Sequence, residues 1–321
     1  MEWEVINITD IGGFRIGNAQ DYKAMTGVTV IIFDKENTGG IHISGGGPAS
    51  RETLLLSPYT NPKSLNAIVL SGGSAYGLEA SSGVMKYLEE HKIGYQVANT
   101  IVPLVCQSCI FDLNIGSSLI RPDSQMGYTA CKNAEYNQPK SGIVGAGTGA
   151  TVGKINGMKQ AQKSGLGYYA LKVGNLKVGA IAVVNAVGDI FDYKTGQKVA
   201  GMLNQERTDF ISSEREIYRM ETALNDLGNT TLGLILTNAS FSQSHMSKIA
   251  KMATSAYGRC INPVGTMADG DTIYAISVDG KVKADLNQVG TLASRVLSEA
   301  ILKAISNSKM SDDEFLAKII S

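Results

Sequence analysis

Short, continuous apolar runs recur along the chain and are typical of strands that are buried on both faces. Such runs span residues 67–70, 176–186, 231–237 and 273–278. Residues 40–44 instead alternate apolar and polar side chains around His42, which predicts a half-buried strand. The pattern therefore predicts a core built on β-structure.

Three segments show the apolar spacing of amphipathic helices. The first follows a glycine-rich turn, with Ser74 as the predicted N-cap and Gly94 as the predicted end. The second is capped by Ser242 and closed by Gly258, and Asp285 caps a third, longer helix. This order mixes antiparallel strands with paired helices, which favours helix layers packed on sheets.

Glycines gather at residues 45–47, 72–73 and 142–153, where the backbone can approach another group closely. The amides of Gly72 and Gly73 lie between a strand and a helix, so they either bind an anion or oxyanion or form a plain turn. Gly153-Lys154 is followed by Ile155 rather than Ser or Thr, and no GxGxxG occurs here. A nucleotide site is therefore not predicted.

Charge and composition exclude several classes of function. Lys and Arg together equal Asp and Glu at 29 each, and no basic run occurs, so we expect neither nucleic acid nor a membrane surface as a partner. The chain contains no transmembrane-length apolar segment and no signal-peptide pattern near Met1, which predicts a cytoplasmic protein. Cys106 and Cys109 form a CxxC without a second ligand pair, which favours buried thiols over zinc.

The segment Gly228-Asn229-Thr230-Thr231 is the strongest chemical signal in the chain. A polar connector, about residues 198–228, ends in a turn pair, and two hydroxyl residues then open an apolar strand. This layout suits self-cleavage before Thr230, because a free α-amine with a pKa near ~7.7–8.0 can act as base for its own hydroxyl. The alternative is that Thr230 and Thr231 are simply β-branched residues at the start of a strand.

Several separated motifs together resemble the DmpA-type aminopeptidases, the L-aminopeptidase/D-esterase group of peptidase family S58. The matching segments are 45–48 with 51–53, 70–78, 102–103 with 110–113, 144–154, 229–233 and 269–272. The resemblance implies a layered α-β-β-α fold like that of N-terminal nucleophile hydrolases, in one domain spanning 1–321. It also implies cleavage into an α chain, 1–229, and a β chain, 230–321, assembled into a homo-oligomer such as a tetramer.

The resemblance also assigns roles to residues. Thr230 is the nucleophile and the cut follows Asn229; Asp269 hydrogen-bonds the amine or hydroxyl of the nucleophile, with Asp271 as a second acidic group. Aspartate at both positions resembles the threonine branch of the family, which includes nylon-oligomer hydrolases.

Five further positions complete the predicted site. Lys154 and Asn185 match polar site positions, and Asn185 would hold the oxyanion or align the nucleophile. Phe111 falls near a position where some relatives have Tyr, so any role of that hydroxyl is lost here. Gly72, Gly73 and Phe111 are candidate oxyanion or substrate-binding residues.

The chemistry that follows is hydrolysis of peptides, amides or esters through an acyl-enzyme, with no metal or organic cofactor. Three alternatives stay open from the sequence. One is a hydrolase of nylon oligomers or other linear amides within the same family. The second is an acyltransferase resembling ornithine acetyltransferase, and the third is an unprocessed, silent homologue.

Overall fold

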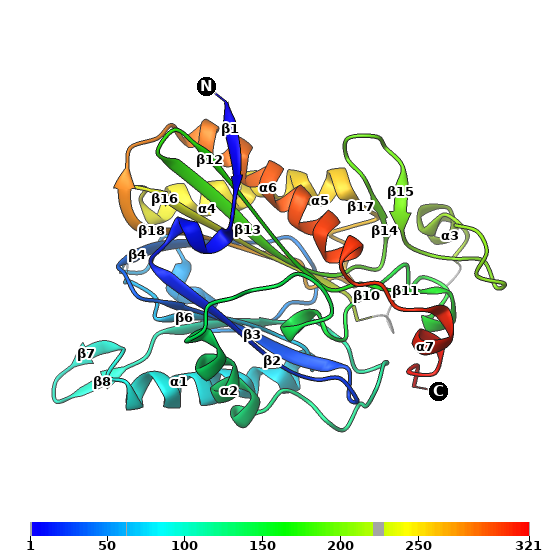
Figure 1. The fold of residues 1–321 in the computed structure, drawn as a ribbon, viewed down its shortest axis with the longest axis horizontal. Helices are drawn as coiled ribbons and strands as arrows, with labels where there is room; N and C mark the ends of the chain where they lie inside the picture. Colours follow the sequence, from blue (N-terminus) through cyan, green and yellow to red (C-terminus); the bar gives the residue numbers. More distant parts are fainter. Residues whose placement is uncertain (1, 62, 221–227, 321) are drawn as a thin grey trace.

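The computed structural model describes residues 2–61, 63–220 and 228–320. Two β-sheets lie face to face, and helices cover the outer face of each sheet (Figure 1). One apolar core fills the space between the sheets. One further core lies between each sheet and the helices that cover it. The layers therefore follow the order α-β-β-α, which confirms the predicted fold class.

The first sheet has six strands in the order β1-β12-β13-β16-β18-β4. Their bounds are β1 (Trp3–Ile6), β4 (Asn37–Ile43), β12 (Leu166–Val173), β13 (Leu176–Asn185), β16 (Thr230–Ala239) and β18 (Thr272–Val282). β16 and β18 are parallel, and the other neighbours are antiparallel. Three of the predicted apolar runs thus form the central strands β13, β16 and β18, where both faces are covered.

The second sheet has five strands in the order β2-β3-β6-β9-β5. Their bounds are β2 (Phe14–Asp21), β3 (Thr26–Phe33), β5 (Ala49–Arg51), β6 (Ala67–Ser71) and β9 (Val105–Cys109). The apolar run at 67–70 is the central strand β6, which pairs in parallel with β9.

Three small sheets and several 3-10 turns lie outside the two main sheets. The small strand groups are β7 (Tyr95–Val97) with β8 (Thr100–Val102), β10 (Thr151–Val152) with β11 (Gln162–Lys163), and β14 (Asp189–Phe191) with β15 (Lys198–Ala200) and β17 (Ile261–Asn262). The 3-10 turns are Ile8–Ile11, Thr53–Leu56, Ser74–Glu79, Gly145–Gly147 and Met158–Gln160.

The helices form two outer layers. α1 (Ala80–Glu90) and α2 (Ser124–Ala134) cover the second sheet, while α4 (Gln243–Ala253), α5 (Ser255–Cys260) and α6 (Leu286–Ser306) lie on the first. α3 (Ser213–Arg219) and α7 (Asp312–Leu316) lie at the side of the sandwich (Figure 1). Ser242 and Asp285 accept backbone amides at the starts of α4 and α6, as predicted.

Two helix predictions were wrong in detail. Ser74 does not cap a helix: its φ is +52°, and its amide donates to the Ile110 carbonyl at 2.9 Å, which ties the turn to the chain after β9. α1 accordingly starts later and ends before Gly94. The helix predicted to end at Gly258 is two helices, because the Thr254 hydroxyl donates back to the Lys251 carbonyl at 2.6 Å and interrupts the regular pattern.

The polar connector predicted at 198–228 is anchored at its start by the buried Asp189. Its carboxylate accepts hydrogen bonds from Lys198 Nζ at 2.6 Å, from the Met202 amide at 2.9 Å, and from the amide and hydroxyl of Ser213 at 3.0 and 2.7 Å. The connector therefore begins as an ordered segment that includes α3. Its residues 221–227 lie outside the described part of the chain.

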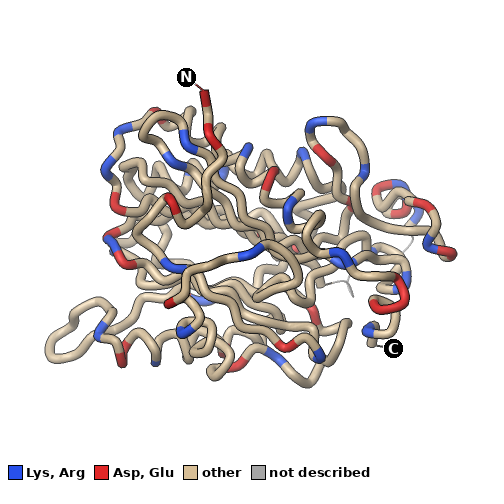
Figure 2. The backbone as a smooth tube through the Cα atoms, in the orientation of Figure 1, with Lys and Arg blue, Asp and Glu red and all other residues tan. Residues whose placement is uncertain are grey.

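Charged residues and cysteines are distributed as the composition predicts. Lys and Arg are interspersed with Asp and Glu over the outside of the fold (Figure 2). All four cysteines are free and buried, as predicted. Among the described residues, no helix has both the length and the apolar character needed to cross a bilayer.

Close packing of α6 on the first sheet predicts that Gly167 tolerates no side chain. A Cβ at Gly167 would lie 1.9 Å from the Ala300 carbonyl oxygen. We expect Gly167→Ala to lower the free energy of unfolding by about 3 kcal/mol, measured by urea denaturation. Gly258→Ala is the matched control, because nothing lies within 4 Å of its added Cβ and alanine favours α5. Equal stability of the two variants would contradict this packing.

Candidate active site

Thr230 is the first residue of β16, in the middle of the first sheet, and is 4% exposed. Leu232 and Leu234 share its face and pack in the core between the sheets, so the Thr230 side chain also points toward the second sheet. Thr230 pairs with Asn185, the last residue of β13, in antiparallel register. Directly opposed residues present their side chains on the same face, so Asn185 and Thr230 are neighbours there.

The Asn229 carbonyl oxygen accepts two hydrogen bonds. One comes from the Thr230 hydroxyl and the other from the Gly270 amide, at 2.8 Å. Asn229 lies beside Asp269 in a parallel bridge that continues the β16–β18 pairing. Gly270 also leaves room for the hydroxyl, because a Cβ there would lie 2.6 Å from Thr230 Oγ1. The hydroxyl and an oxyanion donor thus meet at the peptide group where cleavage is predicted.

The two aspartates are buried, each 1% exposed, and shape the turn before β18. Asp269 accepts hydrogen bonds from the amide and the hydroxyl of Thr266, both at 2.7 Å. Asp271 accepts the Thr231 amide at 2.6 Å and the Gly265 amide at 3.1 Å. These bonds reach the residue next to Thr230 rather than its hydroxyl. The predicted bond from Asp269 to a free Thr230 amine stays a prediction.

Burial raises the pKa of both carboxyl groups. For Asp271 the pKa rises to about 7, because desolvation and then the charge of Asp269 disfavour ionisation. For Asp269 burial is again the main cause of the raised pKa, and hydrogen bonds from Thr266 oppose it. Near neutral pH the Asp271 carboxyl can therefore hold or release a proton.

Lys154 and Asn185 form one buried unit. Lys154 Nζ donates to Oδ1 of Asn185 at 2.9 Å and to its carbonyl at 3.0 Å. Asn185 Oδ1 also accepts the Thr151 amide at 3.0 Å, and Nδ2 donates to the Phe111 carbonyl at 2.9 Å. Lys154 is therefore not a surface charge. Burial lowers its pKa to about 7, against the opposing charges of Asp269, Asp112 and Asp271.

The remaining predicted residues make contacts away from the Asn229 carbonyl. Phe111 packs its ring against Gly228, where a Cβ would lie 2.3 Å from the ring. The Gly72 amide donates to the Gly27 carbonyl at 2.9 Å, and the Gly73 amide to Asp112 at 2.7 Å. Both predicted oxyanion donors are thus already engaged. The donor at the Asn229 carbonyl is instead the Gly270 amide, at 2.8 Å.

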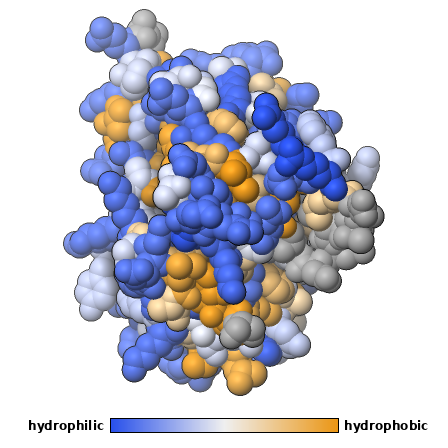
Figure 3. Space-filling view, turned by 90° about the vertical axis from the view of Figure 1, so that its right-hand side faces the viewer, coloured by the Kyte–Doolittle hydropathy of each residue, from blue (hydrophilic) through white to orange (hydrophobic). Residues whose placement is uncertain are grey.

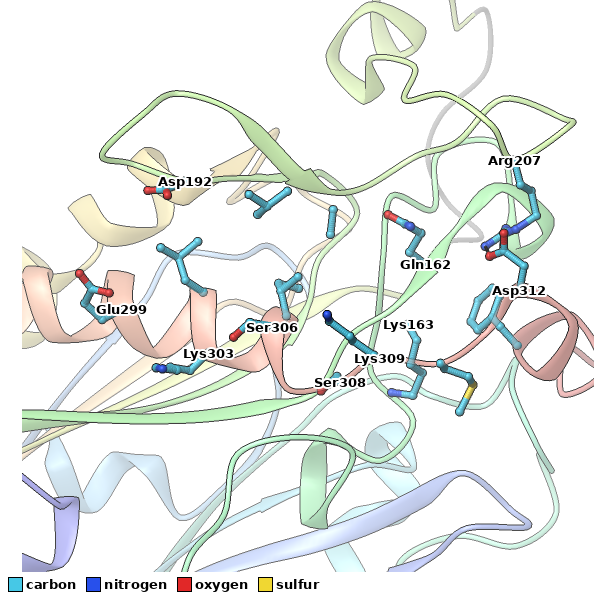
Figure 4. Close-up of a pocket in the computed structure, with 16 residues that line it drawn as sticks. Gln162, Lys163, Asp192, Arg207, Glu299, Lys303, Ser306, Ser308, Lys309 and Asp312 are labelled. Atoms are coloured by element: carbon cyan, nitrogen blue, oxygen red, sulfur yellow. Dashed lines mark hydrogen bonds and ion pairs between the residues drawn. The ribbon is translucent and has the colours of Figure 1, made fainter.

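A cavity of about 630 Å³ lies beside the end of α6, between β11, β15 and α7 (Figure 4). Lys303 and Lys309 line it, and Arg207 pairs with Asp312 at 2.6 Å across one end. Figure 3 shows this side of the molecule, with hydrophobic surface between hydrophilic areas. Within the described part of the chain, none of the predicted site residues lines this cavity.

Comparison with known sequences gives a family match across nearly the whole chain. The profile of the family described as Peptidase family S58 matches residues 7–313. A Mycobacterium leprae protein named an uncharacterized aminopeptidase is 34% identical over 93% of this chain and 90% of its own length. A 6-aminohexanoate-oligomer endohydrolase of Agromyces sp. is 29% identical over 92% of this chain and 84% of its own.

Comparison with solved structures shows the same fold. The L-aminopeptidase D-Ala-esterase/amidase of Ochrobactrum anthropi, described as a variant of the Ntn hydrolase fold, superposes with a TM-score of 0.70 at 14% identity, covering 97% of this chain and 92% of that one. A Burkholderia sp. beta-aminopeptidase gives a TM-score of 0.62 at 16% identity, with coverage of 97% and 92%.

The buried amine of Lys154 predicts how stability depends on pH. Its pKa falls from 10.5 in the unfolded chain to about 7 in the fold, so above about pH 7 only the unfolded chain keeps this proton. Stability should therefore rise between about pH 7 and 9, and Lys154→Met should remove that contribution. Melting temperatures across this range, in a Thr230→Ala background that keeps one polypeptide, measure the effect.

The exposed Lys248 provides the control for this experiment. Lys248→Met should leave the pH dependence as it is in the parent chain. If Lys154→Met shows the same rise with pH as its parent, Lys154 is not the group responsible.

Proposed function

The chain belongs to peptidase family S58 and is a hydrolase, and from this premise we propose that it cuts itself between Asn229 and Thr230 and then hydrolyses amides with Thr230 as nucleophile. The observation that carries the proposal is the shared contact at the Asn229 carbonyl oxygen. The Thr230 hydroxyl and the Gly270 amide both donate to it. A nucleophile and an oxyanion donor at one peptide group are the two elements that acyl transfer needs.

Self-cleavage begins with attack of Thr230 Oγ1 on the Asn229 carbonyl carbon. Negative charge develops on the carbonyl oxygen and is stabilised by the Gly270 amide. The C–N bond breaks as the hydroxyl proton moves to the Thr230 nitrogen, leaving an ester between Asn229 and Thr230. Water then hydrolyses the ester to the Asn229 carboxylate and the Thr230 hydroxyl, and the new β chain begins with a free amine.

Turnover uses the new amine as the base. It accepts the hydroxyl proton while Oγ1 attacks the substrate carbonyl, and it returns the proton to the leaving amine. The buried carboxyls of Asp269 and Asp271 favour the ammonium form that exists between these transfers. Water then hydrolyses the acyl-enzyme by the same path in reverse.

Asn185 is suited to hold the substrate oxyanion. Its side-chain amide carries two hydrogens, and one of them is fixed on the Phe111 carbonyl. The other belongs to a side chain that neighbours Thr230 on the same face of the sheet. Departure of Gly228 and Asn229 also frees the space against the Phe111 ring, and we assign that space to the acyl half of the substrate.

The substrate class follows from this chemistry. Peptides, linear amides and esters present the required carbonyl, and the names of the relatives include both aminopeptidases and oligomer endohydrolases. A cytoplasmic homo-oligomer of cut α/β units stays part of the proposal. Its test is the native mass of the processed protein.

Thr230→Ala should abolish both self-cleavage and hydrolysis, because the attacking oxygen is gone. The wild-type chain of 34.0 kDa should yield pieces of about 24 and 10 kDa, seen by denaturing mass spectrometry. Thr230→Ser keeps a hydroxyl and should still cut. Cleavage at the same bond in Thr230→Ala would show that Thr230 is not the nucleophile.

Gly270→Ala should slow self-cleavage by about 100-fold, because a misplaced nucleophile loses its alignment with the carbonyl. The added Cβ would lie 2.6 Å from Thr230 Oγ1. Gly47→Ala is a matched control in the adjoining turn, where the nearest atom to the added Cβ is 3.8 Å away. Time courses of the two fragments compare the variants, and equal rates would rule out this role for Gly270.

A further inference from the structure

Asp112 is a buried carboxylate that the reaction described above does not use. It follows Phe111 and is 1% exposed. One oxygen accepts the Gly73 amide at 2.7 Å, and the other accepts the Thr26 hydroxyl at 2.8 Å. Among the ion pairs found in the described residues, none includes Asp112. Burying a carboxylate without a cation in contact is costly, which points to a specific role.

The fold makes room for this carboxylate with two glycines from separate clusters. A Cβ at Gly72 would lie 1.9 Å from Asp112 Oδ2, and a Cβ at Gly149 would lie 2.5 Å from Asp112 Cβ. The turn after β6 and the loop before β10 therefore both close around Asp112. The glycines at these positions serve the packing of one acidic side chain.

The segments around Asp112 also hold both ends of the Asn185 side chain. On one side, the carbonyl of Phe111, the preceding residue, accepts Asn185 Nδ2. On the other side, the chain runs from Gly149 to Thr151, whose amide donates to Asn185 Oδ1. The orientation of the Asn185 amide thus depends on two backbone groups that flank Asp112.

Asp112 also acts on the charge of Lys154. Its negative charge raises the pKa of Lys154, together with the charges of Asp269 and Asp271, while burial lowers it. Lys163 is the other cation facing Asp112, and its amine donates to the carbonyls of Gly147, Ala150 and Ser164. Cys109, on β9, is a nearby thiol whose own pKa is raised to about 12, mainly by burial.

We propose that Asp112 is a positioning residue for the reaction at Thr230: its carboxylate fixes the backbone that orients the Asn185 amide. This inference rests on the proposed function of Thr230. Asp112 itself touches neither Thr230 nor the Asn229 carbonyl in the hydrogen bonds of the described chain, so it acts through Phe111 and Asn185.

Asp112→Asn tests this role. Asparagine keeps the shape and an acceptor for the Gly73 amide but removes the charge. We expect kcat for a small amide or ester to fall about 10-fold, as for other residues that orient catalytic groups, with KM little changed. The alkaline limb of the kcat–pH profile should also move to lower pH, because Lys154 loses a neighbouring negative charge.

Three further variants identify the cause. In Lys154→Arg the side chain stays charged at all working pH values. The alkaline limb should therefore vanish if it reflects deprotonation of the Lys154 amine. Thr26→Val removes one bond to Asp112 but not its charge, so kcat should fall without movement of the limb. Asp189→Asn removes a buried carboxylate outside the site, so it should lower the melting temperature and leave the limb in place.

Wild-type kcat and an unmoved limb in Asp112→Asn would overturn the proposal. An equal shift of the limb in Asp189→Asn would do the same, since the effect would then be general. If Asp112→Asn does not fold, unchanged kcat in Thr26→Val decides against the role. A wild-type protein that neither cuts itself nor hydrolyses amides instead refutes the proposed function.

Discussion

The parallel register of β16 and β18 determines the geometry at the Asn229 carbonyl. The pairing runs from Leu232 with Thr272 back to Asn229 with Asp269, beyond the ends of both strands. This extension places the Gly270 amide on the carbonyl and the Asp271 carboxylate on the Thr231 amide. A shift of one residue would turn the side chains to the opposite face and break both contacts. The reactive arrangement is therefore a property of the sheet rather than of a loop.

The site concentrates charged groups in a region with little water. Lys154, Asp269 and Asp271 are each 1% exposed, in a sandwich whose other buried positions are mostly apolar. Such burial opposes folding, and the apolar cores on both faces of the first sheet offset it. Pairs of groups whose pKa values move toward neutrality are common where protons are transferred. Hydrogen bonds to the backbone or to Asn185 hold each of these three groups in place.

Strands and helix caps could be predicted from the sequence where neighbouring residues alone determine them. The apolar runs became the central strands, and the caps at Ser242 and Asp285 form as expected, because a side chain and nearby amides decide them. Ser74 was misjudged because its amide bonds to Ile110, far along the chain. The bond from Gly270 to Asn229 and the enclosure of Asp112 were missed for the same reason: both depend on strand register and on contacts between distant segments. The family resemblance brought Lys154 and Asn185 to attention, whereas their mutual contact required the structure.

The four hydrogen bonds at Asp189 have a consequence for the α chain after the proposed cut. Two of them fasten Ser213 to the body of the protein, and only the stretch from Ser213 to Asn229 separates that anchor from the new carboxyl end. The new carboxyl end is thus a cleavage product that stays covalently attached near the site. Its effective concentration there is on the order of millimolar for a short connection. Substrate would then compete with the new carboxyl end for the site. Dilution does not lower the effective concentration of that end, because it belongs to the same molecule. The apparent affinity for substrate would therefore depend on how fully the new carboxyl end leaves the site.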